Sequence, residues 1–235
     1  MKNAIVLCSG GIDSVTTAYY VKKKLSYEKI TILFFNYNQR TLKQERNAAK
    51  KCARNIGGKF KEINLKWLGG ISTSLINKKT KAEKISRHNL KDTSKESQKF
   101  YVPCRNILFL TYALALADAI WIKEKKLTDI FVGFKNEGKE PFPDATQRFV
   151  KKINELSETS CSTKFKIIAP MIKKDKEDII KLGIKLGINY QDTFTCYVGA
   201  GKKHCGNCLA CRLRQEGFYW ANIPDQTKYQ DKNAK

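Results

Sequence analysis

A six-residue loop near the N-terminus constrains the fold more than any other feature of this chain. Residues 9–14 read S-G-G-I-D-S; they follow the short apolar run 3–8 and open a helical pattern that extends to Lys24. Glycines let the backbone approach a ligand closely, and the unpaired N–H groups and the dipole of a helix N-terminus favour an anion there. The loop therefore predicts a phosphate site. The alternative is a plain glycine turn in which Asp13 or Ser14 only caps the helix.

Two familiar nucleotide-binding motifs are missing from this loop. It has neither the G-x-x-x-x-G-K-S/T pattern nor the G-x-G-x-x-G pattern. A P-loop kinase and a usual dinucleotide site are therefore excluded. The phosphate site must belong to another class of nucleotide-binding protein.

Strand and helix patterns alternate along the first 190 residues. Apolar, β-branched or aromatic runs typical of strands lie at 3–8, 30–37, 60–65, 129–134 and 165–169. Helical patterns lie beyond the loop to 24 and at 42–56, 105–126, 145–159 and 174–186. Repeated β-α units predict an α/β fold, a doubly wound parallel sheet with helices on both faces. We assign residues 1–190 to this domain.

Three segments depart from the alternation. Residues 72–99 are polar, rich in Lys, Ser and Thr and weakly periodic, which predicts an insertion or a lid. Residues 191–224 are rich in Cys and Gly and hold too little apolar material to fold alone. They predict a small lobe stapled by a metal. Residues 225–235 are expected to form a polar tail.

Four cysteines in this lobe have the spacing C-x8-C-x2-C-x2-C: Cys196, Cys205, Cys208 and Cys211. Four thiolates brought together by tight turns suit tetrahedral Zn²⁺ in a closed structural site. An iron–sulfur cluster is the main alternative, since four cysteines also bind such clusters. A disulfide pair, free thiols, or His204 in place of one cysteine are further alternatives.

The chain is strongly basic, and this allows two interpretations. Its 45 Lys and Arg against 22 Asp and Glu give a net charge of +23. Such a charge suits a polyanionic partner such as a nucleic acid. The lysines are spread over the whole length in singles and pairs, however, which is typical of solvated helix faces. Charge alone does not predict RNA binding.

No segment addresses the chain to a membrane. The N-terminal apolar run is too short for a signal peptide. The longest apolar stretch, 107–122, is interrupted by Asp118 and falls below spanning length, so we expect a buried helix there. Clustered cysteines without a secretory signal indicate a reducing compartment, where they more often bind metal than pair. We expect a cytoplasmic protein.

Two further places carry candidate site residues. Arg105 and Asn106 stand at the head of the helix at 105–126, where a guanidinium can clamp a phosphate or carboxylate bidentately. Lys176 follows the strand at 165–169, at the ligand-binding edge of such a sheet. A solvated surface cation is the alternative for Arg105. For Lys176, one of many lysines, it is the usual interpretation, and only a resemblance to a known family selects this residue.

The loop and the cysteines together resemble a known family. S-G-G-x-D-S after an N-terminal strand resembles the PP-loop of the ATP pyrophosphatase superfamily. Together with the cysteine spacing, nearly the whole chain is similar to the 7-cyano-7-deazaguanine synthase (QueC) family. The matching segments are 36–40, which read N-Y-N-Q-R where the family usually has D-Y-G-Q-R, and 101–110, the Lys176 segment at 170–177, 195–197 and 208–214.

This resemblance implies an activity and its cofactors. The family uses ATP and Mg²⁺ to activate the carboxylate of 7-carboxy-7-deazaguanine, adds ammonia to form the amide, and dehydrates the amide to the nitrile with further ATP. Its zinc is structural, and many members are homodimers. An ATP-dependent ligase of this kind forms a C–N bond.

The resemblance also implies site residues. Asp13, Arg105 and Lys176 would be catalytic, with Asp13 the candidate carboxylate for Mg²⁺. The ATP-binding residues would be Cys8, Ser9, Gly10, Gly11, Ile12, Asp13, Ser14 and Lys176. The substrate-binding residues would be Gln39, Arg40, Arg105, Asn106, Phe142 and Asp144.

One segment departs from the family where the deazaguanine should be recognised. Residues 138–146 read G-K-E-P-F-P-D-A-T, and the usual segment resembles D-(Y/F)-S-G-Y-P-D-C-R. Pro143 and Asp144 are retained, but the acidic residue, the Cys and the Arg are missing. Three functions therefore stay open: the synthase itself, a related ligase that passes the activated acyl group to another amine such as a protein amine in an antiphage system, and a tRNA-modifying PP-loop enzyme.

Overall fold

A parallel five-stranded sheet forms the centre of the protein, as the alternating pattern predicts. The computed structural model describes residues 2–78, 85–86, 90–135, 142–199, 201 and 203–230. The strand order is β3-β2-β1-β4-β5, and every pair is parallel. The strands are β1 (Asn3–Leu7), β2 (Lys29–Asn36), β3 (Lys59–Asn64), β4 (Thr128–Phe131) and β5 (Ile167–Ile168).

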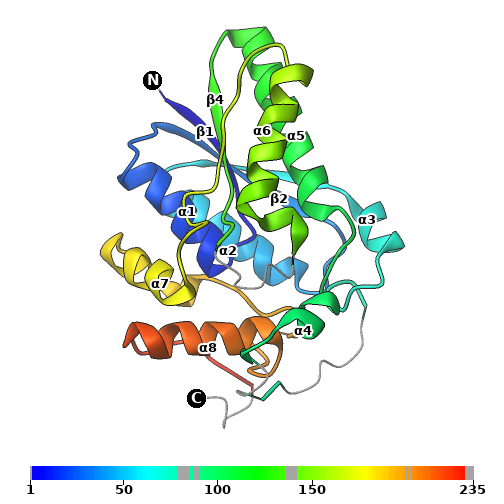
Figure 1. Ribbon diagram of the computed structural model, residues 1–235. Coiled ribbons are helices and arrows are strands. Elements are labelled where there is room, and N and C mark those ends of the chain that lie inside the picture. Colours follow the sequence, from blue (N-terminus) through cyan, green and yellow to red (C-terminus); the bar gives the residue numbers. More distant parts are fainter. Residues whose placement is uncertain are drawn as a thin grey trace.

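Helices cover both faces of this sheet (Figure 1). One face packs against α1 (Ile12–Lys23), α2 (Leu42–Asn55) and α7 (Lys176–Lys185). The other packs against α5 (Arg105–Glu124) and α6 (Gln147–Ser160). The remaining helices are α3 (Lys66–Ile71), α4 (Ser94–Gln98) and α8 (Leu209–Ala221), with 3₁₀ turns at Pro143–Ala145 and Tyr190–Asp192. The doubly wound α/β fold is confirmed.

The alternation of side chains along β1 explains the two layers. Ile5 and Leu7 belong to the core beneath α5, whereas Val6 and Cys8 belong to the core beneath α1. Successive side chains of a strand point to opposite faces of the sheet, and an apolar run with both sets buried is typical of a parallel sheet covered on both sides.

The strand order reverses at β1, and this places the binding crevice. The chain adds β2 and then β3 on one side of β1, and afterwards adds β4 and β5 on the other side. Ligands of open α/β sheets bind outside the carboxyl ends of the strands at such a reversal. The loop that follows β1 occupies this position.

Two short helices escape the sequence patterns. The α3 helix contains Gly69 and Gly70, whose low helix propensity hides it. The α4 helix has five residues and lies in the expected insertion 72–99. Arg40 N–H anchors the described start of that insertion by donating to Ile76 O (2.9 Å), and Leu75 N–H joins the two ends of the insertion by donating to Lys99 O (2.9 Å). Its function as a lid stays a prediction.

Residues 225–230 of the expected tail pack against the Cys-rich segment. His204 N–H donates to Lys228 O (3.0 Å), and Gln230 N–H donates to His204 O (2.8 Å). The side chain of Tyr229 donates to the carboxylate of Asp225. Residues 231–235 lie outside the described part of the chain.

The α5 helix differs from the expectation for the longest apolar stretch. It has 20 residues and is apolar enough that, by length and composition alone, it is able to cross a membrane. Only 28% of its most apolar part is buried in the fold, against the buried helix expected. Within the fold, its Leu110, Ala113 and Leu114 pack against the sheet.

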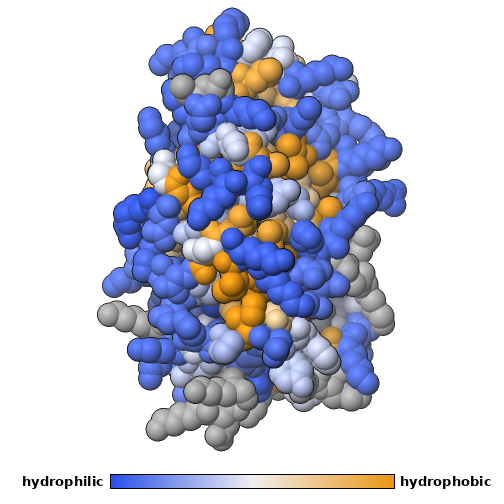
Figure 2. Space-filling view, turned by 90° about the vertical axis from the view of Figure 1, so that its left-hand side faces the viewer, coloured by the Kyte–Doolittle hydropathy of each residue, from blue (hydrophilic) through white to orange (hydrophobic). Residues whose placement is uncertain are grey.

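Polar side chains dominate the outer surface of the face shown in Figure 2, and apolar residues emerge as a band through its middle. This is the side of the molecule on the left of Figure 1. The polar cover agrees with lysines distributed over solvated faces.

Candidate active site at the phosphate loop

The loop after β1 is shaped by close contact with α2. Gly10 has φ +84°, and a Cβ there would lie 2.6 Å from Ala48 Cβ and 2.8 Å from the carbonyl oxygen of Glu45. Only glycine fits such a backbone without displacing α2. On the other side, a Cβ on Gly133, just after β4, would lie 2.8 Å from Ser14 N. The loop is therefore held between α2 and the end of β4.

No side chain from the described residues caps the first turn of α1. Its N-cap residue is Gly11, which has no side chain to cap the helix. Ser14 Oγ donates to Gly11 O (3.3 Å) and lies 3.3 Å from Ser9 Oγ, and Cys8 Sγ donates to Ser14 Oγ (3.6 Å). An uncapped helix N-terminus beside hydroxyl groups is suited to an anion such as phosphate.

A lysine distant in the sequence lies beside this loop. Lys176 is the first residue of α7, and its Nζ lies 2.7 Å from Asp13 Oδ1 and 2.6 Å from Asp13 Oδ2. The two side chains are 12% and 26% exposed. An ion pair shielded in this way is stronger than one on the open surface. A cation and a carboxylate thus stand side by side at the point where the helix dipole favours negative charge.

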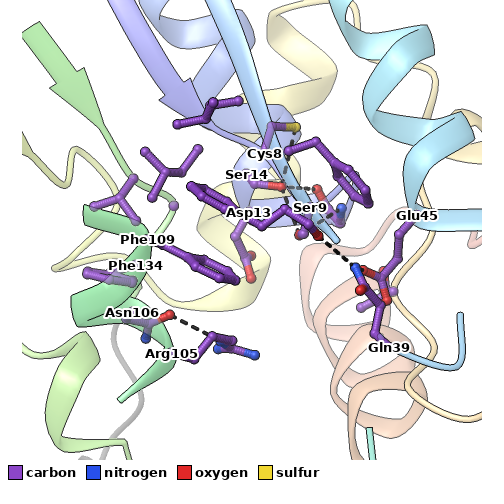
Figure 3. Close-up of a pocket in the computed structure, with 18 of the residues that line it drawn as sticks. Cys8, Ser9, Asp13, Ser14, Gln39, Glu45, Arg105, Asn106, Phe109 and Phe134 are labelled. Carbon is purple, nitrogen blue, oxygen red and sulfur yellow. Dashed lines mark hydrogen bonds between the residues drawn. The ribbon is translucent and has the colours of Figure 1, made fainter. Parts of the chain in front are cut away.

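A cavity of about 240 Å³ opens beside the loop at the carboxyl ends of β1, β2 and β4. Aromatic rings form much of its wall (Figure 3). Phe35 and Phe109 stack with ring centroids 4.0 Å apart and planes within 6°, and Phe134 lies beside them. An apolar pocket with a few convergent polar groups is the usual form of a small-molecule site.

Arg105 and Asn106 supply polar groups at the mouth of the cavity. Arg105 Nε donates to Asn106 Oδ1 (3.3 Å), and its guanidinium lies 5.9 Å from the centre of the Tyr37 ring. Burial raises the pKa of Tyr37 to about 12, so its hydroxyl is protonated at neutral pH. Both residues at the head of α5 line the cavity, and their function as a clamp stays a prediction.

The four cysteines converge on one point. Their sulfur atoms all lie within 4.8 Å of one another, with Cys196 Sγ 3.9 Å from Cys208 Sγ and Cys205 Sγ 3.8 Å from Cys211 Sγ. Tetrahedral Zn²⁺ with Zn–S bonds near 2.3 Å places sulfurs about 3.8 Å apart. This donor set therefore fits a zinc ion or another metal that binds four thiolates.

Backbone N–H groups donate hydrogen bonds to the cysteine sulfurs, as suits thiolates that bind a metal. Gly199 N–H donates to Cys196 Sγ (3.0 Å), and Cys208 N–H donates to Cys205 Sγ (3.3 Å). Hydrogen bonds from the Cys196 thiol and the other two thiols lower the pKa of Cys205, which favours the thiolate. His204 lies apart from the sulfurs: its Nε2 accepts the Thr195 N–H (3.0 Å), and burial lowers its pKa to about 3.

The family of the chain follows from a comparison with known proteins. A model described as "Queuosine biosynthesis protein QueC" matches residues 3–222. The chain belongs to the QueC family.

Similar curated proteins extend the match over whole chains. The 7-cyano-7-deazaguanine synthase of Methanosphaera stadtmanae is 35% identical over 231 residues, which cover 97% of this chain and 98% of that protein. The synthase of Methanocaldococcus jannaschii is also 35% identical, over 238 residues, which cover 96% of this chain and 98% of that protein. Among solved structures, a 4-thiouridine synthetase in complex with RNA and ATP gives a TM-score of 0.48 at 15% identity, covering 97% of this chain and 47% of that one.

Three predicted substrate residues lie outside the described wall of the cavity in this QueC family member. Arg40 Nη1 donates to Lys78 O (3.0 Å). Asp144 Oδ2 accepts the Asn106 N–H (3.2 Å), and Asp144 O accepts from Asn106 Nδ2 (3.1 Å), so Asp144 holds the first turn of α5. Phe142 is half-buried ahead of it. The divergent residues 138–141 lie outside the described residues, and the assignment of these side chains to substrate stays a prediction.

Sequence reasoning missed one acidic residue of the cavity. Glu45 is buried in its wall, where it accepts hydrogen bonds from the Thr41 hydroxyl and from Gln39 Nε2 (3.1 Å). Burial raises its pKa. A signal was present, because Glu45 shares the buried side of α2 with Ala48, Ala49 and Cys52. A carboxylate on the apolar side of an amphipathic helix indicates a partner or a ligand.

Proposed function

We propose that this chain uses ATP to activate the carboxylate of 7-carboxy-7-deazaguanine and converts the acid, through its amide, to 7-cyano-7-deazaguanine. The observation that carries this proposal is the Lys176–Asp13 pair at a phosphate loop that opens directly into an aromatic cavity. The curated relatives named 7-cyano-7-deazaguanine synthase, similar over nearly their whole length, support the substrate.

Activation is needed because a carboxylate is a poor electrophile. Its oxygen attacks the α-phosphate of ATP, the bond to pyrophosphate breaks, and the acid becomes an acyl adenylate with AMP as leaving group. The N–H groups at the start of α1 and the ammonium of Lys176 lie where negative charge grows on the departing pyrophosphate. One donor in such a position is worth about 3 kcal/mol of transition-state stabilisation.

Asp13 is the residue that would hold Mg²⁺ together with the phosphates. Its carboxylate borders the loop and is partly exposed, and hard oxygen ligands suit this ion. When bound, Mg²⁺ supplies neutralisation of the phosphate charge. Lys176 balances the charge of Asp13 in the structure and keeps the carboxylate oriented toward the loop.

The cavity offers complementary groups to a flat, polar ring system. Phe109 and Phe134 give the cavity wall aromatic surface that suits a flat ring, and the guanidinium of Arg105 suits the carboxylate. Among the described residues, Glu45 accepts hydrogen bonds from Thr41 and Gln39, which leaves carboxylate lone pairs for the N–H groups of a guanine-like edge.

Nitrogen then enters in two chemical stages. Ammonia attacks the acyl carbon, AMP leaves, and a proton is lost to give the amide. Adenylation of the amide oxygen by a second ATP releases pyrophosphate, after which loss of AMP and protons forms the nitrile. Exclusion of water from the cavity protects both adenylates from hydrolysis.

The test is mass spectrometry of a reaction that contains the acid, ATP, Mg²⁺ and ammonium. We expect the nitrile mass together with AMP and pyrophosphate. AMP release without amide or nitrile, and capture of the acyl group by an added protein amine, would instead support the ligase. No consumption of ATP with this acid would exclude the deazaguanine substrate.

A further inference from the structure

The α8 helix links the cysteine cluster to the phosphate loop. At its N-terminus, Cys208 is the N-cap residue and Cys211 lies in the first turn. Farther along, Arg214 and Gly217 face the body of the protein and are buried. A metal held by the cysteines would therefore fix the start of the same helix whose middle approaches the ATP site.

Arg214 is the most deeply buried charged side chain among the described residues, at 1% exposure. Its Nη1 donates to Thr193 Oγ1 (2.8 Å) and Thr195 Oγ1 (2.9 Å), and its Nη2 donates to Tyr190 O (3.0 Å). Its Nε lies 3.6 Å from Asp225 Oδ1. Several directed contacts compensate for the desolvation of a buried charge, and the flat guanidinium fork is suited to making them together.

The two threonines flank a residue that bonds directly to the loop. Phe194 N–H donates to Gly10 O (2.8 Å), and Phe194 and Thr195 line the cavity. Cys196, a predicted metal ligand, comes two residues after Phe194 in the same segment. Arg214 therefore holds the segment whose Phe194 bonds to Gly10. Gly10 is the residue whose backbone conformation shapes the phosphate loop.

A second contact from α8 reaches the opposite end of the loop. A Cβ on Gly217 would lie 2.2 Å from Lys176 Cγ and 3.1 Å from Lys176 Cβ. The lysine stem thus runs against the bare backbone of α8 before its Nζ reaches Asp13. The α8 helix therefore contacts both the segment that bonds to Gly10 and the lysine that pairs with Asp13.

We infer that Arg214 is a positioning residue for ATP: it transmits the geometry of the metal-binding lobe to the phosphate loop through Thr193, Thr195 and Phe194. This inference rests on the ATP use proposed above. It assigns the cysteine lobe a part in nucleotide binding beyond the stabilisation of its own fold.

The test is the affinity for ATP with Mg²⁺, measured by calorimetry on the full chain without the acid. We expect Arg214→Lys to weaken ATP binding about tenfold, as for the loss of one charge-assisted hydrogen bond. Its KM for ATP should rise while kcat at saturating ATP is kept, and its metal content should equal that of the wild type. A purely structural residue would lower the active fraction, and with it kcat, without changing KM for ATP.

Arg212→Lys is the matched control on the same helix. Arg212 Nε donates to Ile85 O (3.1 Å) and its Nη1 to Gln215 Oε1 (3.0 Å), away from the loop. We expect its ATP affinity to stay that of the wild type. Thr193→Val removes one hydrogen-bond acceptor of Arg214, and Thr193 does not belong to the described lining of the cavity. If Arg214→Lys does not fold, the ATP affinity of Thr193→Val decides the test.

The outcomes separate the two proposals. Wild-type ATP affinity in both Arg214→Lys and Thr193→Val would overturn this inference and leave the proposed function standing. An equal loss in Arg212→Lys would also overturn it, because the effect would then not depend on the loop contacts. A wild-type protein that binds no ATP would overturn the proposed function and this inference with it.

Discussion

Lys176 Nζ contacts both carboxylate oxygens of Asp13, at 2.7 and 2.6 Å, although 163 positions separate the two residues in the chain. The contact joins the first turn of α1 to the first turn of α7. It places a cation and a carboxylate at the mouth of an open helix N-terminus.

Lys176→Met should abolish most of the ATP-dependent activity. The variant keeps the length of the stem but removes the charge that stabilises the departing pyrophosphate, so we expect kcat to fall roughly 100- to 1,000-fold. Pyrophosphate release in the presence of the acid measures this effect. Lys181→Met, on the exposed side of the same helix, is the control. Equal activity of the Lys176 variant and the wild type would argue against the catalytic assignment.

Gly217→Ala should displace Lys176. The added Cβ would lie 2.2 Å from Lys176 Cγ, so α8 or the lysine stem must move. We expect a loss of about 1–3 kcal/mol in unfolding free energy, typical of overpacking, together with a lower kcat. Chemical denaturation and pyrophosphate release measure the two effects. Gly70→Ala, where the new Cβ would meet no atom of the described residues within 4 Å outside its chain neighbours and its own helix backbone, should leave both nearly unchanged.

Cys208→Ser should release the metal and loosen the lobe. Its sulfur lies 3.9 Å from Cys196 Sγ in a set of four that fits one metal ion. Metal binding contributes directly to folding in such sites, so we expect the melting temperature to fall by about 10 °C. Elemental analysis should find one metal per wild-type chain and identify it as zinc or iron. Cys161→Ser, outside the cluster, should keep metal and melting temperature; metal retained in the Cys208 variant would contradict the site.

Glu45→Gln should change how stability depends on pH. Burial raises the pKa of Glu45 in the folded protein above its usual value of 4.5. A raised folded-state pKa gives stability that is fully present below the unfolded pKa and is lost as pH rises through the folded pKa. The wild type should therefore lose stability relative to the variant as pH rises from 4.5 toward neutrality. Urea denaturation across this range measures the difference, and parallel pH profiles would show that Glu45 does not titrate there.

The sequence pattern identified the parts of the site that depend on consecutive residues. The loop at 9–14, the strand before it and the head of α5 at Arg105 and Asn106 are local features, since strand and helix periods and glycine turns are encoded within a few residues. The cysteine spacing predicted a cluster because each C-x2-C step is a single tight turn. Resemblance to the QueC family then selected Lys176 from among many lysines.

Packing between distant helices decided what the sequence by itself could not. Glu45 enters the cavity because α2 lies against the loop, and Gly217 matters because α8 crosses the stem of Lys176. In the sequence, nothing distinguishes Arg214 from the other basic residues. In the fold, Thr193, Thr195 and Asp225 surround its guanidinium. The sequence alone determined the sheet, the phosphate loop and the cysteine cluster, because these follow from local periodicity and spacing. Only the tertiary structure decided which buried charged residues hold that loop and at which glycines another element packs closely. Such contacts depend on how helices far apart in the chain pack together.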